Sequence, residues 1–302
     1  MELSFRSLFK DASGIEYCVL RNDGADCLCL QGGSDLKGRI RSAYRSAALF
    51  FENSPDNFLK PLSFNESEGR VNALFSNVEA GRLERFLKVV SPEWQYTAGR
   101  RTGRALRLIQ GEPLSEEHLK KAQDRQAGFM EKLADYVGNK PHFIDDAFAM
   151  EALSQRYDNF TLFKPVWRYG MLRHDKIYIT SSGDIVLLPS SSGGPGDICE
   201  DFALLECESA GVYPLYCAGV VDGYFSGKIP SKFWLHFAMY SALYSLWRCA
   251  RKARRDESLQ KTMQQEYDRI RLDFANFKKP VPNWYSSAEV KAARETAVQK
   301  AL

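Results

Sequence analysis

The stretch YGMLRHDKIYITSSGDIVLLPSSSGGPGD, which runs from Tyr169 to Asp197, contains the pattern that decides the fold. Two short apolar runs, IYIT and IVLLP, lie on either side of the turn sequence SSGD, which is typical of a β-hairpin. A loop of small residues, SSSGGPG, follows and leads into an acidic segment with helical periodicity. Helical patterns precede and follow this stretch, so we expect a helical region that one hairpin interrupts.

The N-terminal part has the pattern of β-strands. LSFRSLF, IEYCVLRN and DCLCLQG are separated by the turn sequences KDASG and DGA, and FLKPLSFN and RVNALFSN form a second hairpin pattern. One amphipathic helical segment, LKGRIRSAYRSAALFFEN, lies between the two groups. We therefore expect an α+β chain with a small, mostly antiparallel sheet lobe carrying one helix in residues 1–78. A larger, mainly helical lobe with the hairpin should occupy residues 79–302.

Composition excludes several classes of protein. The 302 residues hold 41 basic and 38 acidic side chains, a net charge of +3, which predicts neither nucleic acid nor a membrane surface as the main partner. The basic run RRTGRALR is interpreted as a solvated helix face. Seven cysteines lack metal-ligand spacing, MELSFRSLFKD lacks a signal-peptide pattern, and no apolar run approaches 18 residues. The expected compartment is a reducing cytoplasm.

The order of these elements resembles the aminoglycoside phosphotransferase and choline-kinase-like family, a branch of the protein-kinase-like fold. FLKPLSF is similar to the family's strand before the hinge, and QYTAGRRTGRALRLIQG to its helix ending in LRxIH. GDICEDFALLE is similar to the turn that opens a helix after the metal site. The resemblance covers nearly the whole chain and implies a two-lobe kinase-like fold with ATP between the lobes.

The resemblance also implies where the catalytic residues would fall, and most of them are replaced. The family's His-Gly-Asp triplet falls on Tyr169, Gly170 and Met171, its asparagine on Lys176, and its metal-binding aspartate on Pro189. A methionine cannot take a proton from an acceptor hydroxyl. Magnesium requires oxygen ligands, whereas lysine offers a cation and proline offers no side-chain ligand. Magnesium is therefore not expected, and no metal site is predicted.

The small lobe departs from the family in the same way. The cation that grips the nucleotide phosphates would fall near Leu30 or Gln31, and Tyr44 stands where its glutamate partner would be. No cofactor is predicted, although ATP stays open as a ligand. If a nucleotide binds, the resemblance implies contacts from Leu30, Gln31, Lys176 and the hinge residues Asn77, Val78 and Glu79.

Three acidic residues could supply a carboxylate in a rearranged site: Asp175, Asp197 and Glu200. Asp175 directly precedes the strand IYIT, which leaves no room for the loop that should follow a catalytic base. We interpret Asp175 as a turn residue and SSSGGPG as a flexible loop.

These observations predict a pseudokinase-like member of the family that binds or regulates without ordinary Mg-ATP phosphoryl transfer. Its partner would be a small molecule or a protein. Two alternatives stay open. One is a small-molecule phosphotransferase of the aminoglycoside or choline type with a rearranged active site, and the other is a structural partner in a complex.

Overall fold

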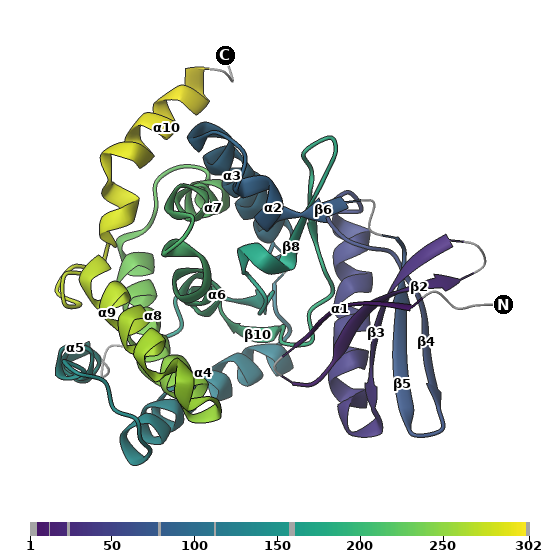
Figure 1. Ribbon diagram of the computed structural model, residues 1–302, viewed down its shortest axis with the longest axis horizontal. Coiled ribbons are helices and arrows are strands. Elements are labelled where there is room, and N and C mark those ends of the chain that lie inside the picture. Colours follow the sequence, from purple (N-terminus) through teal and green to yellow (C-terminus); the bar gives the residue numbers. More distant parts are fainter. Residues whose placement is uncertain are drawn as a thin grey trace. The chain divides into compact units, whose positions relative to one another are not determined.

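The computed structural model of the chain describes residues 5–11, 13–22, 25–77, 80–111, 113–156 and 161–299 (Figure 1). The chain divides into two compact units. Unit 1 holds residues 1–88, 169–171 and 175–194, and unit 2 holds residues 89–168, 172–174 and 195–302. The hairpin and the segment Tyr169–Met171 therefore group with the N-terminal strands, whereas we had placed them with the helices in residues 79–302.

Unit 1 is built on a five-stranded antiparallel sheet with the strand order β1-β2-β3-β5-β4. Its strands are β1 (Phe5–Lys10), β2 (Glu16–Asn22), β3 (Ala25–Gly33), β4 (Pro61–Ser67) and β5 (Arg70–Phe75). Helix α1 (Lys37–Asn53) runs alongside β3, β4 and β5 and buries Ile40, Ala43 and Phe50 (Figure 1). The expected small sheet with one helix is confirmed.

A second, three-stranded sheet explains why the hairpin belongs to unit 1. It pairs β6 (Ala80–Arg82) with β8 (Ile177–Thr180) and β8 with β9 (Ile185–Leu187), all antiparallel. The amide of Leu187 donates to the carbonyl of Asn57 at 2.9 Å, and the Asn57 side chain donates to the carbonyl of Ile185 at 2.7 Å. The short helix α2 (Leu83–Leu87) follows β6. These contacts attach the hairpin to the segment between α1 and β4 and to β6, which follows the five-stranded sheet.

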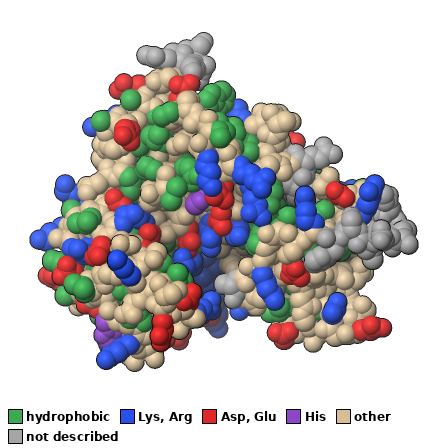
Figure 2. Space-filling view, viewed as in Figure 1, with side chains coloured by type: hydrophobic (Ala, Val, Ile, Leu, Met, Phe, Trp, Pro, Cys, Tyr) green, Lys and Arg blue, Asp and Glu red, His purple; other side chains and the backbone are tan. Residues whose placement is uncertain are grey.

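Unit 2 is mainly helical. Its helices are α3 (Pro92–Ile109), α4 (Glu116–Gly138), α5 (Ala147–Arg156), α6 (Ile198–Leu205), α7 (Pro214–Phe225), α8 (Ser231–Arg255), α9 (Gln260–Asp273) and α10 (Ala288–Gln299). The short strands β7 (Pro165–Arg168) and β10 (Gly194–Asp197) form a two-stranded pair. Acidic and basic side chains are interspersed over the face in Figure 2, in keeping with the net charge of +3.

Helices α3 and α7 approach each other backbone to backbone (Figure 1). Each carries two glycines four residues apart, Gly99 and Gly103 on α3 and Gly219 and Gly223 on α7. A Cβ atom at Gly99 would lie 2.0 Å from the carbonyl oxygen of Tyr216, and one at Gly103 would lie 2.1 Å from that of Val220. The opposing atoms are backbone and cannot turn aside, so this crossing requires glycine.

We expect Gly99→Ala to lower the free energy of unfolding by about 3 kcal/mol or more, because the added methyl group must separate two helices. Gly38→Ala on α1 is the matched control, since no atom lies within 4 Å of the added Cβ there. In a helix this control should stabilise by about 0.5–1 kcal/mol. Urea unfolding followed by circular dichroism measures both, and a loss below about 1 kcal/mol for Gly99→Ala would contradict the backbone contact.

Candidate functional site

Tyr169, Gly170 and Met171, to which the resemblance assigns the family triplet, follow β7, and the chain bends at Gly170. Gly170 has a φ of 74°, and a Cβ atom there would lie 2.2 Å from the carbonyl oxygen of Ser192. Both facts require glycine at this position. Tyr169 and Met171 are buried. The retained glycine therefore has a structural reason, and the methionine is a buried apolar side chain.

Tyr17 is the centre of the polar and aromatic contacts in unit 1. Its strand register places it between Phe9 on β1 and Leu30 on β3. The rings of Phe9 and Tyr17 are stacked with centroids 4.4 Å apart. The Tyr17 hydroxyl donates to the carbonyl of Pro189 at 3.0 Å. Leu30 lies near the place where the resemblance expects the cation that binds the phosphates, and it pairs with Tyr17. Tyr17 in turn bonds to Pro189, which stands at the expected metal-ligand position.

Lys176 and Ser191 complete this group. The Lys176 ammonium lies 3.7 Å from the centroid of the Phe9 ring and 3.3 Å from a carboxylate oxygen of Asp175. The amide of Ser191 donates to the Tyr17 hydroxyl at 3.4 Å. Phe9, Tyr17, Lys176, Pro189 and Ser191 are called the Tyr17 cluster below.

Asp11 shapes the turn between β1 and β2 and attaches it to the loop after β9. One carboxylate oxygen accepts from the amides of Ser13 and Ile15 at 2.9 and 3.0 Å, and from the Ser13 hydroxyl at 2.7 Å. The other oxygen accepts a short hydrogen bond from the Ser191 hydroxyl. In the family resemblance this turn would cover the nucleotide phosphates. Here its carboxylate holds the loop that contains Pro189.

Burial keeps the Tyr17 phenol neutral. The hydroxyl lies in a fully buried position, and burial, with a smaller contribution from the negative charge of Asp11, raises the pKa of Tyr17 well above its usual value. The phenol is therefore protonated at neutral pH and can donate to the Pro189 carbonyl.

We expect Tyr17→Phe to cost about 1–2 kcal/mol of unfolding free energy, because the buried Pro189 carbonyl and Ser191 amide lose their partner. Tyr178→Phe is the control, since Tyr178 is buried in β8 and its hydroxyl makes no hydrogen bond to the described residues. Amide exchange of residues 189–192 should accelerate in the first variant and not in the second. Equal exchange in both would show that the hydroxyl does not hold the loop.

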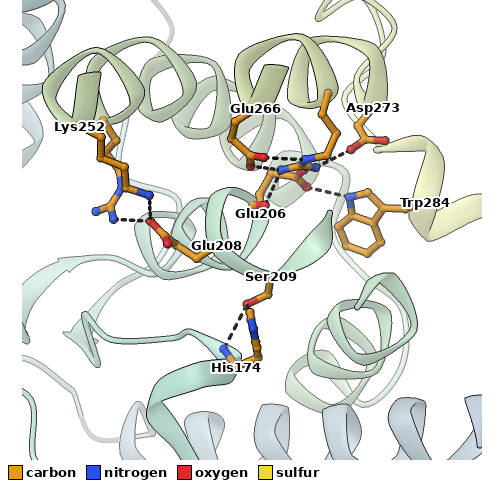
Figure 3. Close-up of polar contacts among 10 residues, drawn as sticks. His174, Glu206, Glu208, Ser209, Lys252, Glu266, Asp273 and Trp284 are labelled. Atoms are coloured by element: carbon orange, nitrogen blue, oxygen red, sulfur yellow. Dashed lines mark hydrogen bonds and ion pairs between the residues drawn. The ribbon is translucent and has the colours of Figure 1, made fainter. Parts of the chain in front are cut away.

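In the segment that follows Met171, Arg173 and His174 contact the π-helix Glu206–Ala210, which follows α6, and Figure 3 shows the contact of His174 with Ser209. The His174 amide donates to the Ser209 hydroxyl at 3.2 Å, and His174 Nδ1 lies 3.0 Å from the same oxygen. Arg173 lies 3.4 Å from a carboxylate oxygen of Glu208. Wide π-type turns redirect side chains that an α-helix would point elsewhere. Here the turn directs Glu208 and Ser209 to the segment after Met171.

Glu206 and Glu208 are buried charges with different partners (Figure 3). Glu206 accepts from Arg269 and from the indole N–H of Trp284, each at 2.7 Å, yet burial raises its pKa. Glu208 contacts Arg248 at 2.7 Å and Lys252 at 2.8 Å. Burial opposes its ionisation, but Arg248, Arg173 and Lys252 outweigh burial and lower its pKa to about 2. Glu208 is thus a stable anion that anchors the segment.

Because the pKa of Glu208 is lowered on folding, its stabilising effect is complete above about pH 4.5 and is lost as the pH falls toward 2. We expect Glu208→Gln to be less stable than the wild type at pH 7 by up to about 3 kcal/mol. The difference should shrink between pH 5 and pH 3 in urea unfolding experiments. Glu117→Gln, at a fully exposed carboxylate on α4, should match the wild type, and a pH-independent deficit in Glu208→Gln would contradict the assignment.

The three acidic residues considered for a rearranged site have different surroundings. Asp197 is fully buried at the start of α6 and accepts from the amides of Cys199 at 2.9 Å and Phe163 at 2.6 Å. Asp175 is partly exposed and pairs with Lys176. The Asp197 carboxylate therefore has backbone partners that fix the chain, as an N-cap does.

Glu200 is also engaged in unit 2. Both of its carboxylate oxygens lie 2.9 Å from Arg125 Nε, and Arg168 Nε lies 3.4 Å away. The Tyr244 hydroxyl donates to it at 2.9 Å. Burial disfavours its ionisation, but Arg168 and Arg125 prevail and lower its pKa. This buried ion-pair network joins α4, α6, α8 and β7.

The remaining expected nucleotide contacts do not form one group. Leu30 pairs with Ala73 and is buried, whereas the next residue, Gln31, points to the opposite face of the sheet and donates to Glu16 at 3.0 Å. Tyr44 packs between Phe64 and Phe75. Asn77 is exposed, and Val78 and Glu79 lie outside the described residues.

Sequence reasoning missed the residues that organise this region. Asp11 and Tyr17 contact residues more than 170 positions later, and Ser209 contacts a residue 35 positions earlier. Asp11 in the turn sequence KDASG was a signal for a capped turn, but nothing in the sequence indicated its second partner. Among the described residues, no group of three or more histidine, cysteine or acidic side chains is arranged to hold a metal ion. None of the described helices is long and apolar enough to cross a membrane.

Comparison with known proteins shows the fold. No family model matches the sequence, and no curated protein matches it either. Solved structures do match. A thermostable mutant of aminoglycoside phosphotransferase APH(4)-Ia aligns over 88% of this chain and 93% of its own, with a TM-score of 0.61 and 10% identity.

Two further structures extend this likeness. ADP-bound aminoglycoside phosphotransferase APH(2'')-Ib aligns over 94% of this chain and 95% of its own, with a TM-score of 0.59 and 12% identity. An ethanolamine kinase from Plasmodium vivax aligns over 99% of this chain and 82% of its own, with a TM-score of 0.51 and 12% identity. The chain thus has the α+β, kinase-like fold of these proteins, as the sequence predicted.

Proposed function

We propose that this chain is a pseudokinase-like protein that binds or regulates without ordinary Mg-ATP phosphoryl transfer. The observation that carries the proposal is the Tyr17 cluster. In it, the Lys176 ammonium lies over the Phe9 ring of β1, and the backbone carbonyl of Pro189 accepts a hydrogen bond from Tyr17 of β2. Lys176 and Pro189 are the positions to which the resemblance assigns the family's metal ligands.

The chemistry of these positions argues against the usual reaction. General-base assistance is typically worth about 10²- to 10⁴-fold in rate, and buried Met171 cannot give it. Magnesium prefers carboxylate, amide and water oxygens, and the Pro189 carbonyl is already used by the Tyr17 hydroxyl. The ammonium of Lys176 would repel a divalent cation. For a nucleotide to bind at these positions, the contacts of the Tyr17 cluster would have to break, or the nucleotide would have to bind without magnesium.

The alternative of a rearranged phosphotransferase depends on Asp175. Asp197 accepts from two backbone amides, and Glu200 binds Arg125 and the buried Arg168. Freeing either carboxylate would leave buried groups unpaired. Asp175 is partly exposed and pairs with a lysine that could move. Asp175→Asn therefore tests this alternative with little expected effect on folding.

We expect calorimetric titration with ATP to show no tightening by magnesium beyond about twofold, since no described carboxylate stands at the metal positions. ADP release in the presence of Mg-ATP and aminoglycoside or choline acceptors should equal the rate without protein. If metal-free ATP binds, Lys176→Ala should weaken it, while Lys60→Ala at an exposed lysine of the same unit should not.

Two results would overturn the proposal. One is magnesium-dependent ATP binding together with turnover that Asp175→Asn abolishes, which would establish the rearranged enzyme. The other is turnover that survives Asp175→Asn, which would place the base elsewhere. If neither ATP nor a small-molecule acceptor binds at millimolar concentration, we expect the ligand of this protein to be another protein.

A further inference from the structure

One side of α3, next to the contact with α7, carries a row of three arginines that the proposed function does not use. Arg100, Arg104 and Arg107 are spaced four and three residues apart and therefore project from the same side of the helix. Arg104 and Arg107 are exposed and Arg100 is partly exposed. Burial, and then the positive charge of Arg107, lowers the pKa of Lys164, which lies just before β7. These four residues are called the α3 basic row.

The α3 basic row is not neutralised by ion pairs within the described part of the chain. None of its four side chains forms an ion pair with a described residue, and Lys164 donates to the neutral hydroxyl of Tyr224 at 3.0 Å. The pKa of Arg104 is lowered by partial burial and then by Arg100, Arg107 and Arg101. The cations thus stand close enough to repel one another.

Two ordinary explanations account for this row incompletely. A solvated basic helix face usually alternates with acids at helical spacing, as Glu117 and Lys121 do on α4. No acidic residue stands three or four positions from any of the three arginines. The C-terminal end of α7, which packs against the Arg100 backbone at Gly223, carries roughly half a negative charge, far less than four cations.

We propose that the α3 basic row binds an anion that carries two or more phosphate groups. Guanidinium groups bind phosphate oxygens in pairs, and a row of three can hold adjacent phosphates at once. Lys164 adds an ammonium group, which donates to the Tyr224 hydroxyl at 3.0 Å. A single-stranded nucleic acid would also need exposed aromatic rings for its bases, and Tyr224 is buried. A free oligophosphate group is therefore the favoured ligand.

Titration calorimetry with inorganic tripolyphosphate tests this site. We expect saturable binding that weakens at least about 10-fold in the double variant Arg104→Gln/Arg107→Gln, because both guanidinium groups contact phosphate. The control Arg255→Gln/Lys261→Gln removes the same charge at exposed positions of α8 and α9 and should change the affinity by less than about twofold. Lys176→Ala should leave the affinity unchanged, which separates this site from the nucleotide position discussed above.

Three outcomes would overturn the proposal. The first is the absence of saturable binding at tripolyphosphate concentrations up to about 5 mM, a millimolar limit that corresponds to very weak affinity. The second is an equal loss of affinity in the two double variants. The third is a loss of binding in Lys176→Ala alone. The same titration is repeated with a single-stranded RNA of about 20 nucleotides, long enough to cover a typical single-strand binding site, and with a polyglutamate peptide. If either binds more tightly than tripolyphosphate and is lost in Arg104→Gln/Arg107→Gln, the row recognises that macromolecule instead.

Discussion

The hydrogen bond from the Tyr17 hydroxyl to the Pro189 carbonyl is the interaction on which the candidate site depends. It joins the second strand of the sheet to the loop after β9. The Asp11 carboxylate makes the parallel link from the turn before that strand to Ser191. Both links are buried or partly buried, where an unpaired polar group is costly, so the two segments are stabilised together.

A second constraint concerns buried carboxylates. Asp197, Glu200 and Glu208 each bind backbone amides or two or more cations, because a charge removed from water must be paired. Because of this requirement, these three acids stabilise the fold, although their residue type alone would make them candidates for reactive groups. The π-helix has the same consequence, since it directs Glu208 and Ser209 to Arg173 and His174. The segment after Met171 is therefore fixed by unit 2 side chains.

The α3–α7 contact shows how packing decides which surface is available. Glycines at the crossing let the two backbones meet, and this fixes the rotation of α3 about its axis. With Gly99 and Gly103 against α7, Arg100, Arg104 and Arg107 are placed on the adjoining side of the helix, next to Lys164. The basic run RRTGRALR, which is interpreted from the sequence as a solvated helix face, thus places three of its arginines in one row.

The sequence by itself determined the small sheet with one helix, the helical remainder and the hairpin, because strand alternation, helical spacing and turn residues are local signals. The partners of Tyr17, Asp11 and Ser209 and the grouping of the hairpin with unit 1 were decided by the tertiary structure. Those contacts join residues far apart in the chain, and no local pattern encodes which distant group will satisfy a buried polar atom.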